Sequence, residues 1–168
     1  MKRGIKILLI TIVSLLILLF LIRLIAPTEI DYVTPGISCS EIEKYNPDIL
    51  YVIPNYNSGA ISNNVQWCDY ILSLNKTLAL HGITHSYREF LYLNISQAEF
   101  NYGMSEFESC FNKSPEMFKP PQMKINKENK NLVKENNLKL KTGFSQVIHK
   151  VYHCNDTGII SNEIIKIF

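Results

Sequence analysis

An uncharged apolar run near the N-terminus constrains this chain more than any other feature of its sequence. The residues from Ile7 to Ile22 carry no charge, three basic residues precede them, and Arg23 follows. A run of this length can cross a bilayer as a helix, and the long side chain of Arg23 can reach the interface. Because basic flanks stay in the cytoplasm, the sequence predicts a cytoplasmic stub and single-span anchor over residues 1–26. Residues 27–168 then form an extracytoplasmic domain held at the cell membrane.

A cleaved signal peptide is the alternative for this segment. Its apolar core would be unusually long, and no small-x-small cleavage site follows it. We therefore expect an uncleaved anchor.

The chain has 168 residues and a net charge of +2, which fits one domain beyond the anchor and argues against a nucleic-acid partner. Seven lysines lie between Lys119 and Lys141. Such a run is typical of a solvated helix face, although contact with an anionic glycan or lipid headgroup is an alternative.

The four cysteines are Cys39, Cys68, Cys110 and Cys154, and none has Cys-x-x-Cys spacing. In an oxidising compartment they can form two disulfides in three possible pairings, or remain as buried free thiols. The spacing argues against a cysteine zinc site.

Strand-like and helix-like segments alternate beyond the anchor. The predicted strands are Glu29–Thr34, Asp48–Ile53, Thr77–Leu80, Met117–Phe118, Leu138–Lys141 and Gln146–Tyr152. The predicted helices are Ser40–Tyr45, Val65–Leu74, Ser96–Phe111 and Asn126–Asn137, while Ile159–Phe168 fits either state. Alternation with fully apolar strands predicts a parallel α/β sheet or barrel. The roughly 140 residues available are too few for a full eight-stranded barrel.

The third predicted strand ends in a pair of histidines. The sequence TLALHGITHSYREF at 77–90 places His81 at the end of an apolar run and His85 four residues later. Residues four apart on a helical turn lie about 5–6 Å apart at Cβ. Two such imidazoles can both reach one zinc ion at about 2.0–2.1 Å. A merely structural pair is the alternative.

Two further strand ends carry polar or turn-forming residues, and working residues gather at strand ends in parallel α/β folds. Asp31 with Thr34 and Pro35 lies at the end of the first strand, and Lys119 with Pro120 and Pro121 lies at the end of the fourth. Since the first strand follows the anchor directly, this end of the sheet should point away from the bilayer.

Together these segments resemble the polysaccharide deacetylase superfamily of NodB-like carbohydrate esterases, most closely its uncharacterised deacetylase-like branch. The resembling segments are DYVTP at 31–35, VIPN at 52–55, LHGITHS at 80–86 with REF at 88–90, and FKPP at 118–121. The resemblance implies an incomplete or distorted parallel β/α barrel with one divalent metal, usually zinc.

Carried over to this chain, the resemblance makes His81 and His85 metal ligands. Asp31 matches one of two adjacent aspartates, of which one binds the metal and the other acts as base. Tyr32 stands where the metal-binding aspartate is expected, so Asp31 has to serve as base or as ligand. Another acid, Asp69 or Glu89, is an alternative third ligand.

The resemblance also implies a late histidine acting as general acid. The candidates are His149 and His153, which we place four apart on one face of a short strand, where they equally read as surface residues. Glu89 is expected to orient a histidine ring as an outer-shell partner, or simply to pair with Arg88.

Tyr87 and Phe90, with Tyr92, are candidates for a sugar-stacking wall, and Pro120 and Pro121 for further substrate contacts. Ordinary packing is the alternative for all of them.

Two functions are consistent with these residues. The first is a membrane-anchored, metal-dependent deacetylase-like hydrolase acting on acetylated extracellular glycan. The second is a catalytically degenerate member of the fold that binds glycan or stabilises an envelope assembly. The sequence does not name the glycan or the oligomeric state.

Overall fold

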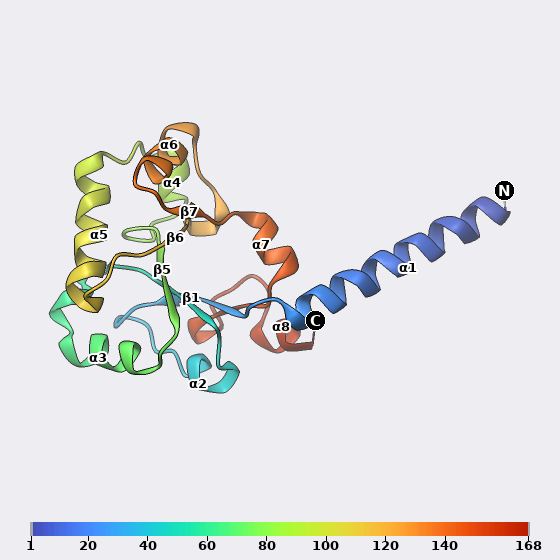
Figure 1. Ribbon diagram of the computed structural model, residues 1–168, viewed down its shortest axis with the longest axis horizontal. Helices are drawn as coiled ribbons and strands as arrows, with labels where there is room; N and C mark the ends of the chain where they lie inside the picture. The colour runs from blue at the N-terminus through green and yellow to red at the C-terminus, as the bar shows by residue number, and fades with distance from the viewer. Residues whose placement is uncertain (1, 168) are drawn as a thin grey trace.

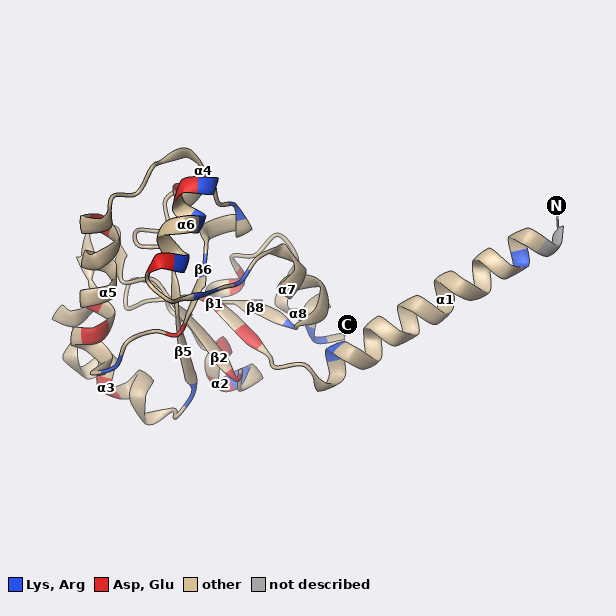
Figure 2. Cartoon of the chain, turned by 45° about the horizontal axis from the view of Figure 1, so that its top comes forward, with Lys and Arg blue, Asp and Glu red and all other residues tan. Residues whose placement is uncertain are grey.

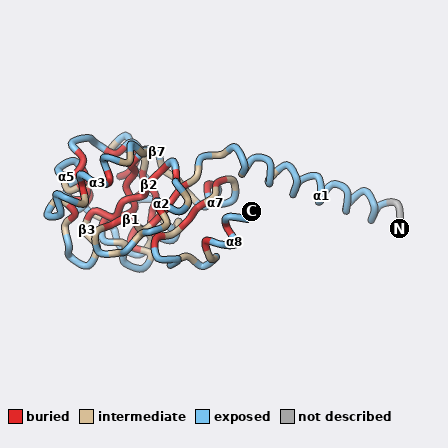
Figure 3. Tube along the Cα trace, turned by 90° about the horizontal axis from the view of Figure 1, so that it is seen from below, coloured by how far each residue is buried: buried red, intermediate tan, exposed pale blue. Residues whose placement is uncertain are grey.

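The computed structural model describes residues 2–167, and it begins with a long helix that projects from an α/β domain (Figure 1). This helix, α1 (Lys2–Ile25), is exposed along most of its length (Figure 3). Its Gly4–Ile25 portion is long and apolar enough to cross a membrane, and a signal sequence has the same properties. Figure 2 shows no charged residue along its middle.

The domain is built on a six-stranded sheet in the order β7-β6-β5-β2-β1-β8, in which every neighbouring pair is parallel. Its strands are β1 (Glu29–Val33), β2 (Ile49–Val52), β5 (Thr77–His81), β6 (Met117–Lys119), β7 (Lys139–Leu140) and β8 (Val151–His153). The predicted parallel α/β architecture is therefore confirmed. A closed barrel is not confirmed, because β7 and β8 form the two edges of the sheet in the described residues.

Helices connect the strands and cover one face of the sheet (Figure 1). They are α2 (Glu41–Tyr45), α3 (Val65–Ser73), α4 (Glu89–Tyr92), α5 (Gln97–Phe111), α6 (Lys127–Glu135), α7 (Gly143–Ile148) and α8 (Asn162–Ile167). The longest of the domain, α5, starts with a capping box, in which Ser96 and Glu99 exchange hydrogen bonds with each other's backbone amides.

Side chains alternate between the two faces of the strands, and the faces differ in chemistry. On the helix-covered face, Leu50, Leu80 and Phe118 join the main hydrophobic core. On the other face, Tyr51 and Ala79 form a small separate cluster. The second face also carries the ionisable residues described below, so the alternation itself separates the core from the candidate site.

One local prediction differs from the structure, and two segments with no assigned element in the sequence analysis have a defined one. The segment predicted as a strand over Gln146–Tyr152 is split, because residues 143–148 form α7 and only Val151–His153 pair with β1. The segment after Ile159, which fits either state by sequence, contains the helix α8. The segment over 55–64, for which no helix or strand is predicted, contains a short antiparallel hairpin, β3 (Asn55–Tyr56) and β4 (Gly59–Ala60), and the 3-10 turn Ile61–Asn63.

All four cysteines are paired. Cys39 bonds to Cys154, and Cys68 bonds to Cys110. The free-thiol alternative was wrong. The first bond links the loop after β1 to the end of β8, and the second links α3 to α5.

Candidate functional site

A bulge at the end of β1 brings two adjacent side chains to the same place. The pairing of β1 with β2 shifts register between Ile30 and Val33, and Tyr32 has a φ of 68°. A positive φ is costly for a bulky residue and is kept only where the surroundings enforce it. Asp31 is 3% exposed, and the Tyr32 ring lies 4.3 Å from the His85 ring, centroid to centroid. The bulge thus turns the Asp31-Tyr32 pair toward the histidines.

The two histidines of the motif do converge. Nδ1 of His81 donates a hydrogen bond of 3.0 Å to the backbone carbonyl of Lys119, since a carbonyl can only accept. This bond leaves Nε2 of neutral His81 unprotonated, and Nε2 of His85 lies 3.1 Å from it. The backbone between them turns through Gly82, at a φ of +66°, where an added Cβ would meet Pro121 at 2.6 Å.

Glu89 holds the loop that carries His85. Its buried carboxylate accepts hydrogen bonds from the backbone amides of Ile83, Thr84 and His85, at 3.1, 2.9 and 3.3 Å, and from the Thr84 hydroxyl at 2.8 Å. The expectation that Glu89 orients a histidine ring was therefore wrong in its detail. It orients the backbone, because all of its recorded hydrogen-bond partners belong to the loop.

A buried ion network lies next to the histidines. Lys119 is fully buried, and its Nζ donates to Glu29 at 2.8 Å and to Asp31 at 2.7 Å. Nζ also lies 4.1 Å above the Tyr51 ring, and His149 hydrogen-bonds the other oxygen of Glu29. Placing Lys119 among solvated lysines was wrong, because its position in β6 points it into the charged face of the sheet. Glu29 was missed, although its spacing of two from Asp31 was a readable signal.

The two late histidines have different surroundings, and both are buried or nearly so. His149 directly follows α7 as its C-cap residue, is 8% exposed and hydrogen-bonds Glu29. His153 ends β8, and its Nε2 lies 3.9 Å from Oδ2 of Asp31. The expectation that they share one face of a strand at the surface was wrong, because only His153 is in the strand.

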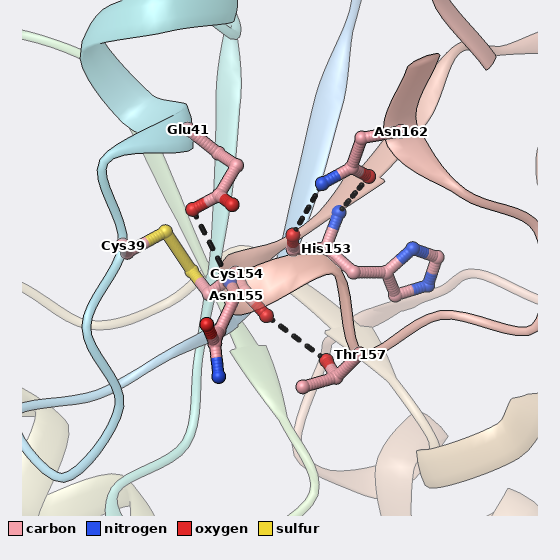
Figure 4. The surroundings of a disulfide bond; sticks show 7 residues. All are labelled: Cys39, Glu41, His153, Cys154, Asn155, Thr157 and Asn162. Carbon is pink, nitrogen blue, oxygen red and sulfur yellow. Dashed lines mark hydrogen bonds between the residues drawn. A yellow bond between two sulfur atoms is a disulfide. The ribbon is translucent and has the colours of Figure 1, made fainter. Parts of the chain in front are cut away.

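The surroundings of His153 fix its position closely (Figure 4). Its backbone exchanges two hydrogen bonds with Asn162, at 2.9 and 2.7 Å, and the next residue is tied to Cys39 by the disulfide. A Cβ at Gly158 would lie 2.3 Å from Nδ1 of the ring. This Nδ1 is buried without a hydrogen-bond partner among the described residues.

Burial and charge set the protonation states of the site. Burial, the largest single effect, opposes ionisation of Asp31, but the charge and hydrogen bond of Lys119 together with the nearby His81 and His153 outweigh it and hold the pKa of Asp31 below its usual value. Burial lowers the pKa of His81 to about 3 and also lowers the pKa values of His85 and His153. At neutral pH the site thus contains an ionised carboxylate and neutral imidazoles, which are the forms that bind metal ions.

The donor set suits zinc, but the third ligand is not in place. Neutral imidazole nitrogens and a carboxylate oxygen are common zinc ligands. Oδ2 of Asp31 lies 4.0 Å from Nε2 of His81. In the part of the chain that the structure describes, no group of three or more His, Cys, Asp or Glu side chains has the arrangement of a metal site. Asp69, the alternative ligand, lies exposed on α3, and Glu89 is occupied by the loop amides.

A cavity of about 350 Å³ opens beside these groups. Asp31, Tyr32, His81 and His153 line it, and so does Pro120. The lining continues through Ile160 and Ile165 to Arg23 at the base of α1. The cavity thus runs back toward α1, which the expectation of a site facing away from the bilayer did not foresee.

The other predicted substrate contacts are less well placed. Phe90 is fully buried in the core against Phe118, so it cannot touch a ligand as expected. Tyr87 and Tyr92 are exposed and flank Arg88, outside the residues that line the cavity. Pro121 packs on Gly82 rather than lining the cavity.

Comparisons with known proteins give matches among solved structures alone. No protein-family model matches the chain, and no curated protein sequence does. A CE4 family pseudoenzyme from Bacillus anthracis matches with a TM-score of 0.47 and 15% identity, over 59% of this chain and 34% of the other. A family 4 carbohydrate esterase from Streptomyces lividans, in complex with acetate, matches with a TM-score of 0.44 and 14% identity, over 55% of this chain and 46% of the other.

The chain thus spans less than half the length of either structure. Likeness at this level concerns the course of the backbone and says nothing of activity. Over the part that they share, the chain is similar in backbone course to these two carbohydrate esterase family 4 structures.

Proposed function

We propose that the chain is a membrane-anchored, metal-dependent hydrolase that removes acetyl groups from extracytoplasmic glycan. The single observation that carries this proposal is that the His81–His85 pair meets the ionised carboxylate of Asp31 beside a cavity that Asp31 and His81 line. A buried carboxylate beside neutral imidazoles is expensive to maintain and is typical of a reactive site.

His81 and His85 would hold the metal ion through their Nε2 atoms. Zinc, when bound, would supply a water of lowered pKa and would polarise the acetyl carbonyl. The hydrogen bond from His81 to the Lys119 carbonyl supports this role, because metal-binding histidines usually donate their second N–H to such an acceptor. Glu89 keeps the His85 loop in the conformation that brings the two rings together.

Asp31 is placed to act as the base. Its Oδ1 is held by Lys119, which leaves Oδ2 directed toward His81 and His153. Oδ2 takes the proton from the attacking water, whose oxygen bonds to the acetyl carbon. The C–N or C–O bond to the sugar then breaks, acetate leaves, and the proton is delivered to the sugar nitrogen or oxygen.

His153 is the better placed of the two candidate acids. Its Nε2 lies 3.9 Å from Oδ2 of Asp31, a separation that one bridging water spans. It lines the cavity, whereas His149 is occupied by Glu29. The proton that Asp31 accepts therefore has a route to the leaving group through the His153 ring.

A catalytically degenerate glycan-binding protein is the second candidate, and Tyr32 is the observation that favours it. The Tyr32 ring packs 4.3 Å from the His85 ring and 5.7 Å from the His153 ring. It takes the position at which a second carboxylate would complete a metal shell. A site lacking that ligand can hold a sugar against its aromatic and imidazole rings without hydrolysing it.

Metal content and acetate release separate these candidates. The full chain, purified in detergent, should contain close to one zinc ion, and the His81→Ala/His85→Ala variant should contain none. Equal zinc in both proteins would reject the metal site. Acetate release from a panel of acetylated sugars should then be abolished in Asp31→Asn. Zinc binding with no acetate release from the wild-type protein would select the degenerate candidate.

A further inference from the structure

The face of the domain beside α1 carries an unusual concentration of exposed apolar side chains. They belong to α7, to the loop before α8, and to α8 itself, and they are Phe144, Val147, Ile159, Ile160, Ile164 and Ile167. Phe144 is 72% exposed, and Ile159 is fully exposed. Contiguous exposed apolar groups on a folded domain mark a surface that contacts something apolar. We call these six residues the apolar face.

The apolar face lies at the base of the membrane helix. Figure 1 shows α7 and α8 beside the C-terminal end of α1, and Figure 3 shows the same neighbourhood from below. The joint is fixed, because the guanidinium of Arg23 donates to the carbonyls of Gln146 and Val147 at 3.0 and 2.8 Å. These carbonyls lie in the last turn of α7, where a cation is favoured by the helix dipole.

The apolar face also reaches the depth of the hydrocarbon. An apolar groove lies between α1 and α8, lined by Leu16, Leu19 and Phe20 on one side and by Ile160, Ile164 and Ile165 on the other. Leu16 lies nine residues before the end of α1, about 13 Å along its axis. If α1 spans the bilayer, a groove at that depth is in contact with lipid chains.

The groove adjoins the cavity of the candidate site. Arg23, Ile160 and Ile165 line both spaces. A single ligand can therefore place a polar end against Asp31 and the histidines and an apolar end along α1. Arg23 lines this junction, and the Nζ of Lys150 donates a hydrogen bond to the carbonyl of Lys166 in α8. Basic residues close to a membrane surface attract anionic headgroups.

We propose that the apolar face is embedded in the bilayer that α1 spans, and that the site takes its sugar from a lipid-linked acetylated glycan presented at that surface. The occupant of the groove is then the lipid chain of the ligand. This second part rests on the proposed deacetylase function, whereas membrane contact of the apolar face does not.

Fluorescence quenching tests the membrane contact independently of activity. The full chain is placed in lipid nanodiscs after Trp67→Phe removes its single tryptophan. Ile159→Trp, or Phe144→Trp as a second probe, then reports on the apolar face. Tyr102→Trp is the matched control, because Tyr102 is an exposed aromatic residue on α5, away from α1. Replacing ordinary phosphatidylcholine with chain-brominated phosphatidylcholine should more than halve the emission of both probes and leave the control unchanged. Emission that is equally insensitive at all three positions would overturn the proposal.

Substrate preference tests the second part. Acetate release is compared for an acetylated sugar linked to a lipid in the same nanodisc and for the same sugar free in solution. The lipid-linked form should be hydrolysed at least tenfold faster. Equal rates would overturn the assignment of a lipid-linked substrate. No acetate from either form would count against the proposed function, while the quenching result would still decide the membrane contact.

Discussion

Replacing Lys119 with methionine should destabilise the domain far more than any other lysine substitution in the chain's basic segment. Lys119 is fully buried, and its Nζ forms ion pairs with Glu29 and Asp31, at 2.8 and 2.7 Å. Methionine keeps much of the shape of the side chain and removes its charge. Two carboxylates would then share a dry site with no lysine between them.

The expected loss follows from the cost of an uncompensated buried charge. Removing one partner of a buried pair typically costs about 3–5 kcal/mol. For a chain of this size, that loss corresponds to a fall in Tm of roughly 6–20 °C. Lys139→Met is the control, because Lys139 is exposed on β7, and a surface substitution of this kind changes stability by about 0.5 kcal/mol or less.

The assay is urea unfolding of the full chain in detergent with both disulfides intact, followed by the fluorescence of Trp67, which packs against Phe111. The triple variant Glu29→Gln/Asp31→Asn/Lys119→Met should recover much of the loss, since replacing a whole buried ion group can be nearly neutral. A Lys119→Met variant as stable as Lys139→Met would refute the reasoning.

The pH dependence of this effect has a definite sign. Lys119 keeps the pKa of Asp31 below its unfolded value, so the stabilisation is present at neutral pH and is lost as pH falls through the folded pKa. In Lys119→Met, the attraction of the lysine is lost, and burial, the largest effect on Asp31, raises its pKa. The gap in stability between the variant and wild type should therefore narrow as the pH is lowered toward 4. A gap that widens on acidification would contradict the assignment of Lys119 as the compensating charge.

Two further substitutions test how the site is held. Gly158→Ala would place a Cβ 2.3 Å from Nδ1 of His153 and should abolish acetate release with a small loss of Tm. Gly143→Ala is the control, because its Cβ would have no atom within 4 Å, and it should change neither acetate release nor Tm. Activity retained in Gly158→Ala would argue against a role for the His153 ring. Glu89→Gln should weaken zinc binding at least tenfold, because the neutral amide holds the His85 loop less well than the carboxylate does. Zinc affinity is measured by competition with a chelator. An unchanged zinc affinity would show that the loop does not depend on this carboxylate.

Sequence reasoning located β1, β2, β5 and β6 because each is a short apolar run closed by a turn residue. It placed Asp31 and His81 at strand ends for the same reason, and those ends lie side by side because the sheet is parallel. The capping box at Ser96 was also readable, since it depends on residues three apart. Signals of this kind are local, and the structure has the elements that they indicate.

The sequence by itself determined the apolar helix, the alternating α/β pattern and the pair of histidines, because each of these features depends only on residues close together in the chain. Only the tertiary structure decided that Lys119 is buried, that His153 rather than His149 reaches the cavity, and that Cys39 joins Cys154. These outcomes depend on contacts between residues about 90 to 120 positions apart, such as Lys119 with Glu29 and His149 with Glu29. Pairings at that separation are set by the order and register of the strands, which no local pattern encodes.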